Sequence, residues 1–152
     1  MTRDDEPVGP DAHNRLIWAL RRAELAARAV KEQRLRPLGL APAHYSLLMI
    51  VHTDPGLTGA ELARRLDVTP QAVASLVAKL VEKGQLERRS HPRHRHVREL
   101  HLTDVGRRLL KSADTAIASI EQELTERLGA QDTTRLTKLL EESIDVLRET
   151  KP

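Results

Sequence analysis

The stretch TPQAVASLVAKLVEKG, residues 69–84, most constrains what this chain can fold into. Thr69 can cap a helix with its hydroxyl, and Pro70 suits the first helical position, where no backbone N–H is needed. Apolar residues then recur at helical spacing and form one stripe: Val73, Leu76, Val77, Leu80 and Val81. The opposite face is small and polar: Gln71, Ala74, Ser75, Ala78 and Lys79. The pattern predicts a helix that buries one side and presents the other closely to a partner.

The residues on either side of this helix predict a winged helix. Upstream, Thr58 and Glu61 form a capping box that starts a helix from Gly59 to Leu66, and a turn of about three residues follows. Downstream, residues 86–103 read as two strands joined by a basic, proline-containing loop, and the second strand alternates apolar and polar side chains. Helix, turn, helix and a positively charged hairpin are the elements of a winged helix-turn-helix.

Residues 57–106 resemble the bacterial MarR (multiple antibiotic resistance regulator) family. The resemblance lies in the ELARRL helix, the TPQAV helix start, the LVEKGQLERR segment, the loop arginine at Arg95 and the LTDVG sequence that opens a long helix. By the order of elements it extends over residues 16–147. It implies a homodimer whose recognition helices lie in successive major grooves of double-stranded DNA, while wing arginines enter the flanking minor grooves. It also implies a transcriptional regulator, most often a repressor, that a small aromatic or phenolic anion releases from its operator.

The polar helix face and the wing supply the candidate DNA contacts. Short side chains let the backbone approach, while amides, hydroxyls and cations bind base edges and phosphates. Gln71 can pair bidentately with adenine, and the Arg95 that matches the family position suits a narrow, A/T-rich minor groove. The predicted DNA-binding residues are Thr69, Gln71, Ala72, Ser75, Lys79, Arg88, Arg93 and Arg95. An ordinary solvated surface is the alternative interpretation of these positions.

Two positions depart from the family pattern. Ala74 stands where many members have an arginine, which leaves the base preference open. His94 stands where the family usually has an aspartate just before the wing arginine. Because histidine becomes cationic near pH 6.5, we expect DNA affinity to grow as the pH falls through that range.

The histidines as a group define no metal or effector site. Four cluster in the wing: His91, His94, His96 and His101. No helical histidine pair, cysteine or paired carboxylate completes a zinc site there, so we expect no bound metal and no cofactor. His44 and His52 are eight residues apart and are candidates for an effector cleft, with partly buried structural histidines as the plainer interpretation.

The rest of the chain is expected to be helical, which gives a mainly α fold with a small antiparallel β wing. Residues 1–10 are predicted to be a disordered tail, because they are charged and contain proline and glycine. Residues 11–56 and 104–149 are predicted to form a helical dimerisation region, and residues 57–103 the winged helix-turn-helix DNA-binding region, within one integrated domain. Long Ala/Leu stripes on the helices predicted for 11–36, 104–128 and 131–149 favour a homodimer. A monomer whose terminal helices wrap the winged helix is the alternative.

Composition excludes several classes of function. The chain has no cysteine, which rules out sensing by cysteine oxidation. No apolar run has membrane-spanning length and the N-terminus is acidic, so we expect a cytoplasmic protein with no membrane association. Residues 86–101 hold five arginines and four histidines against two glutamates, whereas residues 121–149 are acidic, a distribution that suits DNA contact at one place. No nucleophile elbow, Walker loop, Rossmann glycine pattern or HExxH motif is present, so no enzyme is expected.

Two other functions fit the same pattern. One is a zinc-responsive regulator of the same fold, which a chelator would inactivate. The other is a winged-helix module that binds protein instead of DNA. The salt dependence of DNA binding separates the latter from a regulator, because phosphate contacts release counterions and protein contacts mostly do not.

Overall fold

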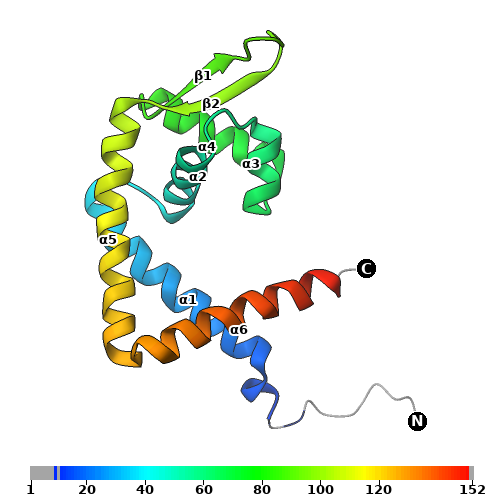
Figure 1. Ribbon diagram of the computed structural model, residues 1–152, viewed down its shortest axis with the longest axis vertical. Helices are drawn as coiled ribbons and strands as arrows, with labels where there is room; N and C mark the ends of the chain where they lie inside the picture. The colour runs from blue at the N-terminus through cyan, green and yellow to red at the C-terminus, as the bar shows by residue number, and fades with distance from the viewer. Residues whose placement is uncertain (1–8, 10, 151–152) are drawn as a thin grey trace.

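The computed structural model describes residues 9 and 11–150, and within them it contains six α-helices and a two-stranded antiparallel sheet (Figure 1). The elements are η1 (Ala12–Asn14), α1 (Leu16–Leu35), η2 (Arg36–Leu38), α2 (Pro42–Thr53), α3 (Gly59–Leu66), α4 (Pro70–Glu82), β1 (Leu86–Ser90), β2 (Arg98–Leu102), α5 (Asp104–Leu128) and α6 (Ala130–Glu149). The predicted class, mainly α with a small β wing, is confirmed. The predicted disordered tail, residues 1–10, lies outside the described residues except for Gly9.

Helices α2, α3 and α4 share one apolar core with the sheet. Its most deeply buried side chains are Leu35, Leu47, Leu48, Val51, Leu62, Val73, Leu80 and Leu86. The strands pair with Leu86 opposite Leu102, so the apolar end of the hairpin packs on the helices while its polar end extends away from them (Figure 1). The predicted stripe of the 69–84 helix therefore does hold this helix against the core.

Threonine caps set where the two central helices begin. The hydroxyl of Thr58 accepts from the backbone N–H of Glu61 at 3.3 Å, and Glu61 Oε2 accepts from the backbone N–H of Thr58 at 2.7 Å. This is the predicted capping box. Thr69 Oγ1 accepts from the backbone N–H of Ala72 at 3.2 Å, which confirms the second cap. Between the helices, Asp67 takes a left-handed conformation with φ 52° and turns the chain.

The first long helix is shorter than the sequence predicted. It was expected from residue 11, but α1 begins at Leu16. Arg15 is extended and its side chain caps nothing, and the residues before it form only the short helix η1. The N-cap position is occupied by Arg15, which is not a capping residue, so the apolar spacing alone could not place the boundary.

Helix α5 connects the two ends of the molecule (Figure 1). Its first turns pack against α2 and β2, and it also contacts α1 and α6, which lie at the far end from the wing. None of the described residues of α6 is buried, and Leu35 alone is buried in α1. Within the described part of the chain, no helix is long and apolar enough to cross a membrane.

Candidate nucleic-acid interface

Helix α4 presents a small, polar face to solvent beside the wing. Val73, Val77 and Leu80 are buried beneath it. The predicted DNA-binding residues of this helix are all exposed: Thr69, Gln71, Ala72, Ser75 and Lys79. Such a surface can enter a groove and offer amide, hydroxyl and cationic groups to bases and phosphates.

The helix ends where the wing begins. Gly84 has φ +68°, a left-handed conformation that glycine adopts without strain, and its N–H donates to the carbonyl of Val81 at 2.9 Å. Gln85 then donates to the carbonyl of Leu80 at 2.9 Å before β1 starts. The turn holds the wing next to α4, so the polar helix face and the hairpin lie at the same end of the molecule (Figure 1).

The wing arginines fall into two groups. Arg89 Nε donates to Glu87 Oε1 at 2.8 Å, and Arg98 Nη1 donates to Ser90 Oγ at 2.8 Å. Among the described residues, no hydrogen-bond or ion-pair partner is found for the side chains of Arg88, Arg93 and Arg95, the three wing residues predicted to bind DNA. Their guanidinium groups need no internal pair to be broken before they contact phosphate or a base edge.

The tip of the wing is a closed turn. The backbone N–H of His91 donates to the carbonyl of Val97 at 3.0 Å, and the N–H of Val97 donates to the carbonyl of His94 at 2.8 Å. Arg95 lies inside this second turn, at the far end of the hairpin. The exposed Arg93 and His96 flank it. The geometry therefore carries a cluster of cations and histidines away from the helical body.

The two effector candidates do not share one cleft. His52 lines two neighbouring hollows of about 200 and 410 Å³ between α2 and the start of α5, both of which also involve Arg107. His44 lines neither hollow. Burial, and then the positive charges of Lys83 and Lys79, lower the pKa of His44. Its Nε2 atom is buried and has no hydrogen-bond partner among the described residues.

No set of three or more histidine, acidic or cysteine residues that could hold a metal ion occurs among the described residues. The carboxylate of Glu99 does contact two wing histidines: its Oε2 lies 3.0 Å from His101 Nε2, and its Oε1 lies 3.7 Å from His91 Nε2. The Glu99 carboxylate is thus the neighbouring acceptor of both imidazole rings. The alternation of the second strand predicts Glu99 and His101 on one face, whereas the contact between Glu99 and His91 depends on the cross-strand register and on the fold of the tip.

Comparison with known proteins places this fold in a family. The sequence model of the MarR family matches residues 38–95. The HTH-type transcriptional repressor Rv2887 of Mycobacterium tuberculosis is 31% identical over 138 residues, which are 91% of this chain and 94% of the relative. The solved structure of the transcriptional repressor CouR bound to a 23-mer DNA duplex has a TM-score of 0.84 and 28% identity, and the match covers 91% of this chain and 99% of CouR.

A structure of Rv2887 in complex with salicylic acid has a TM-score of 0.69 and 30% identity, with 91% of this chain and 97% of that chain covered. These relatives are transcriptional regulators rather than enzymes. Their likeness extends over nearly the whole chain, including the helices at both ends as well as the winged helix. On this identity and coverage, the protein belongs to the MarR family.

Proposed function

We propose that this protein is a homodimeric, sequence-specific transcriptional repressor that binds an inverted-repeat operator in double-stranded DNA and is released by a small aromatic or phenolic anion. The similar repressors CouR and Rv2887 have been solved bound to DNA, and Rv2887 also in complex with salicylic acid. The observation that carries the proposal is the grouping of the exposed α4 face and three unpaired arginines at one end of the molecule.

In this proposal α4 is the recognition helix. Gln71 and Ser75 read base edges in the major groove, Ala72 packs on thymine methyl groups, and Thr69 and Lys79 bind the phosphate backbone. Arg93 and Arg95 enter the flanking minor groove, where the negative potential concentrates, and Arg88 contacts the backbone. Residues 57–103 thus form the DNA-binding region.

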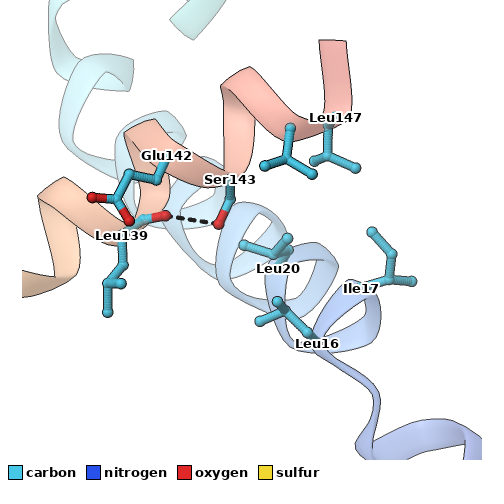
Figure 2. Close-up of a pocket in the computed structure, with 8 residues that line it drawn as sticks. Leu16, Ile17, Leu20, Leu139, Glu142, Ser143 and Leu147 are labelled. Carbon is cyan, nitrogen blue, oxygen red and sulfur yellow. Dashed lines mark hydrogen bonds between the residues drawn. The ribbon is translucent and has the colours of Figure 1, made fainter. Parts of the chain in front are cut away.

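The dimer is supported by apolar surface at the opposite end. Exposed apolar side chains line α1, the end of α5 and α6: Leu16, Ile17, Leu25, Leu124, Leu128, Leu136, Leu139, Ile144, Val146 and Leu147. Side chains from α1 and α6 face each other across an open apolar hollow of about 390 Å³ (Figure 2). A surface of this extent is unusual for a monomer, and a second copy is its natural partner. Residues 11–56 and 104–149 form the proposed dimerisation region.

The hollows at His52 are the proposed effector site. They lie where α2 meets α5, between the winged helix and the helix that leads to the dimer surface. Arg107 and Lys111 line the larger hollow with His52, and Met49 and Leu110 add apolar surface. Among the described residues, its one acidic lining residue, Asp114, accepts a hydrogen bond from the Tyr45 hydroxyl. Cations beside an apolar wall suit an aromatic carboxylate, because the ring and the charge are both accommodated.

Selection of bound sequences from random DNA tests the function. The expected consensus is an inverted repeat with half-site centres about 10 base pairs apart, bound with an affinity that falls steeply as salt rises. Aromatic acids such as salicylate, added to the selected complex, are expected to release the DNA. Failure to enrich any sequence, or retention of DNA that does not depend on salt, would contradict DNA recognition and favour a protein-binding module.

A further inference from the structure

The imidazole of His91 caps the turn that forms the wing tip. Its Nδ1 atom accepts from the backbone N–H of Arg93 at 3.0 Å and from the backbone N–H of His94 at 3.2 Å. Asparagine and aspartate side chains close turns in the same way, by accepting from the backbone two or three residues on. Pro92, the residue between, has no N–H and a fixed φ, so it fits the turn without needing a partner.

The cap requires one protonation state of the ring. A nitrogen that accepts two N–H groups cannot carry a proton, so the neutral ring must hold its proton on Nε2. Nε2 faces Glu99 Oε1 at 3.7 Å, and that side of the ring therefore points at an acceptor. Glu99 is held in turn by His101, at 3.0 Å. The His91 and Glu99 side chains are only 33% and 18% exposed, so water competes weakly with these contacts.

The capped backbone carries the free wing cations. Arg93 supplies one of the two capped N–H groups, and His94 supplies the other as well as the carbonyl that closes the turn around Arg95. Without the cap, two backbone N–H groups at the tip lose their acceptor. The backbone from which the Arg93 and Arg95 side chains extend is then no longer held in one conformation. The tip then samples more conformations, and their ordering on DNA costs free energy.

We propose that His91 is a positioning residue for the wing arginines, and that only its neutral form holds the tip in the shape that grips DNA. This inference rests on the proposed DNA-binding function and adds a pH-dependent control to it. Protonation places a third N–H against the two backbone donors on the Nδ1 side and disrupts the cap. Acid therefore loosens the wing through His91.

Other charges face this ring from each neighbouring element. Glu99 on β2 attracts the protonated ring, and the His94 imidazole lies 5.1 Å from it, centroid to centroid. Arg93, Arg95 and His96 add positive charge from the tip, while Arg98 is engaged with Ser90. On DNA, protonated His94 and His96 would favour binding, which opposes the effect of His91. A raw pH profile mixes these effects, so the test compares variants that share all groups but one.

His91→Asn and His91→Ala form the matched pair. The Oδ1 atom of asparagine is as many bonds from Cα as the Nδ1 atom of histidine, and it accepts the same N–H groups but does not titrate. At pH 8, we expect the selected operator to be bound about tenfold more weakly by His91→Ala and within about twofold of native affinity by His91→Asn. Between about pH 8 and 5.5, the affinity of the native protein should fall relative to His91→Asn. The contributions of His94 and His96 cancel in this ratio.

Three outcomes would overturn the inference. They are equal affinities of all three proteins at pH 8, a native-to-asparagine ratio that stays flat with pH, and an asparagine variant as weak as the alanine variant. A second measurement does not involve DNA: imidazole ¹⁵N shifts at pH 8 should show an unprotonated Nδ1 and a protonated Nε2 for His91. The opposite tautomer would exclude the cap. If no protein binds DNA while the shifts are as expected, the proposed function fails and the cap stands.

Discussion

The hydroxyl of Tyr45 on α2 donates to Asp114 Oδ1 on α5 at 3.2 Å, across 69 residues of sequence. This bond joins the winged-helix core to the helix that leads to the proposed dimer surface. Burial, followed by the hydrogen bond and the negative charge of Asp114, raises the pKa of Tyr45 to about 12. The contact thus stays intact over the whole range in which an ordinary tyrosine would begin to ionise.

The first prediction concerns the titration of this tyrosine. Tyr45 is the only tyrosine in the chain, so absorbance near 295 nm should follow it alone and give a pKa of about 12. Tyr45 ionises near pH 10 in the unfolded state and near pH 12 in the folded state. The contribution of this tyrosine to the free energy of unfolding is therefore fully present below pH 10 and is lost as the pH rises toward 12. Asp114→Asn should lower the pKa toward 10. An unchanged pKa in that variant would exclude the carboxylate as a cause.

The second prediction concerns the capping box in acid. Hydrogen bonds from the backbone and then the side chain of Thr58 lower the pKa of Glu61. A depressed pKa stabilises the fold above the ordinary value of 4.5, and this contribution is lost as the pH falls through the folded-state pKa. The free energy of unfolding in urea should therefore exceed that of Glu61→Gln at pH 7, and the difference should shrink by about pH 3. If the native protein and Glu61→Gln differed by the same free energy of unfolding at both pH values, ionised Glu61 would not be the source of the stabilisation.

The third prediction concerns Gly106, the glycine of the LTDVG sequence. A Cβ atom added there would lie 2.0 Å from the backbone carbonyl oxygen of Gln85. Gly106→Ala must push β1 away from α5, and should lower the free energy of unfolding by about 3 kcal/mol or more. Gly59→Ala, at a helical glycine with no atom within 4 Å of the added Cβ, is the control and should be neutral or slightly stabilising. Comparable losses in both variants would argue against this steric explanation.

The fourth prediction separates base reading from minor-groove binding. Gln71→Ala should cost about 1–3 kcal/mol and relax the preference at one base pair in each half-site. Arg95→Ala should weaken binding evenly across core sequences, flatten the salt dependence and erase any A/T bias at the flanks. Arg89→Ala is the control, because its guanidinium is paired with Glu87 and should contribute less. Normal binding by folded Gln71→Ala and Arg95→Ala would disprove the docking scheme.

The fifth prediction concerns the surface of α6. Leu139 and Leu147 are 49% and 45% exposed, so glutamate at both positions should leave the subunit folded but place charge in the proposed dimer contact. Sedimentation equilibrium should then give 17.1 kDa, against twice that mass for the native protein. Val105→Glu, with 47% exposure at the opposite end of α5, is the control and should stay dimeric. A native protein that sediments as a monomer would refute the dimer directly.

Local signals in the sequence predicted the centre of the fold well. Thr58, Glu61 and Thr69 act within three residues of their partners, so their caps follow from spacing alone. The alternation of Leu100 and Leu102 with polar neighbours likewise predicted which side of β2 is buried. The start of α1 could not be predicted because no cap marks it, and only the structure shows a short 3₁₀ turn there.

Features of the interface that depend on long-range geometry could not be predicted. The sequence shows five wing arginines but not that Arg89 and Arg98 are engaged, since this follows from side-chain direction on the strands. It shows that His44 and His52 are eight residues apart. It does not show that, of these two histidines, His52 lines the hollows beside Arg107 and His44 does not. The sequence indicates His91 only as one more charge of the wing, whereas in the structure its Nδ1 atom accepts two backbone N–H groups.

Helix α5 is unbroken from Asp104 to Leu128, which makes it a lever of about 37 Å. A rigid rod of that length turns a tilt of about 5° at one end into a displacement of about 3 Å at the other, close to the rise of one DNA base pair. In the proposed dimer, a ligand that moved α2 and α5 apart by a fraction of an ångström near one end of this helix would shift the two copies of α4 out of register with successive major grooves. Under this proposal, release from the operator would require neither unfolding of the wing nor dissociation of the dimer.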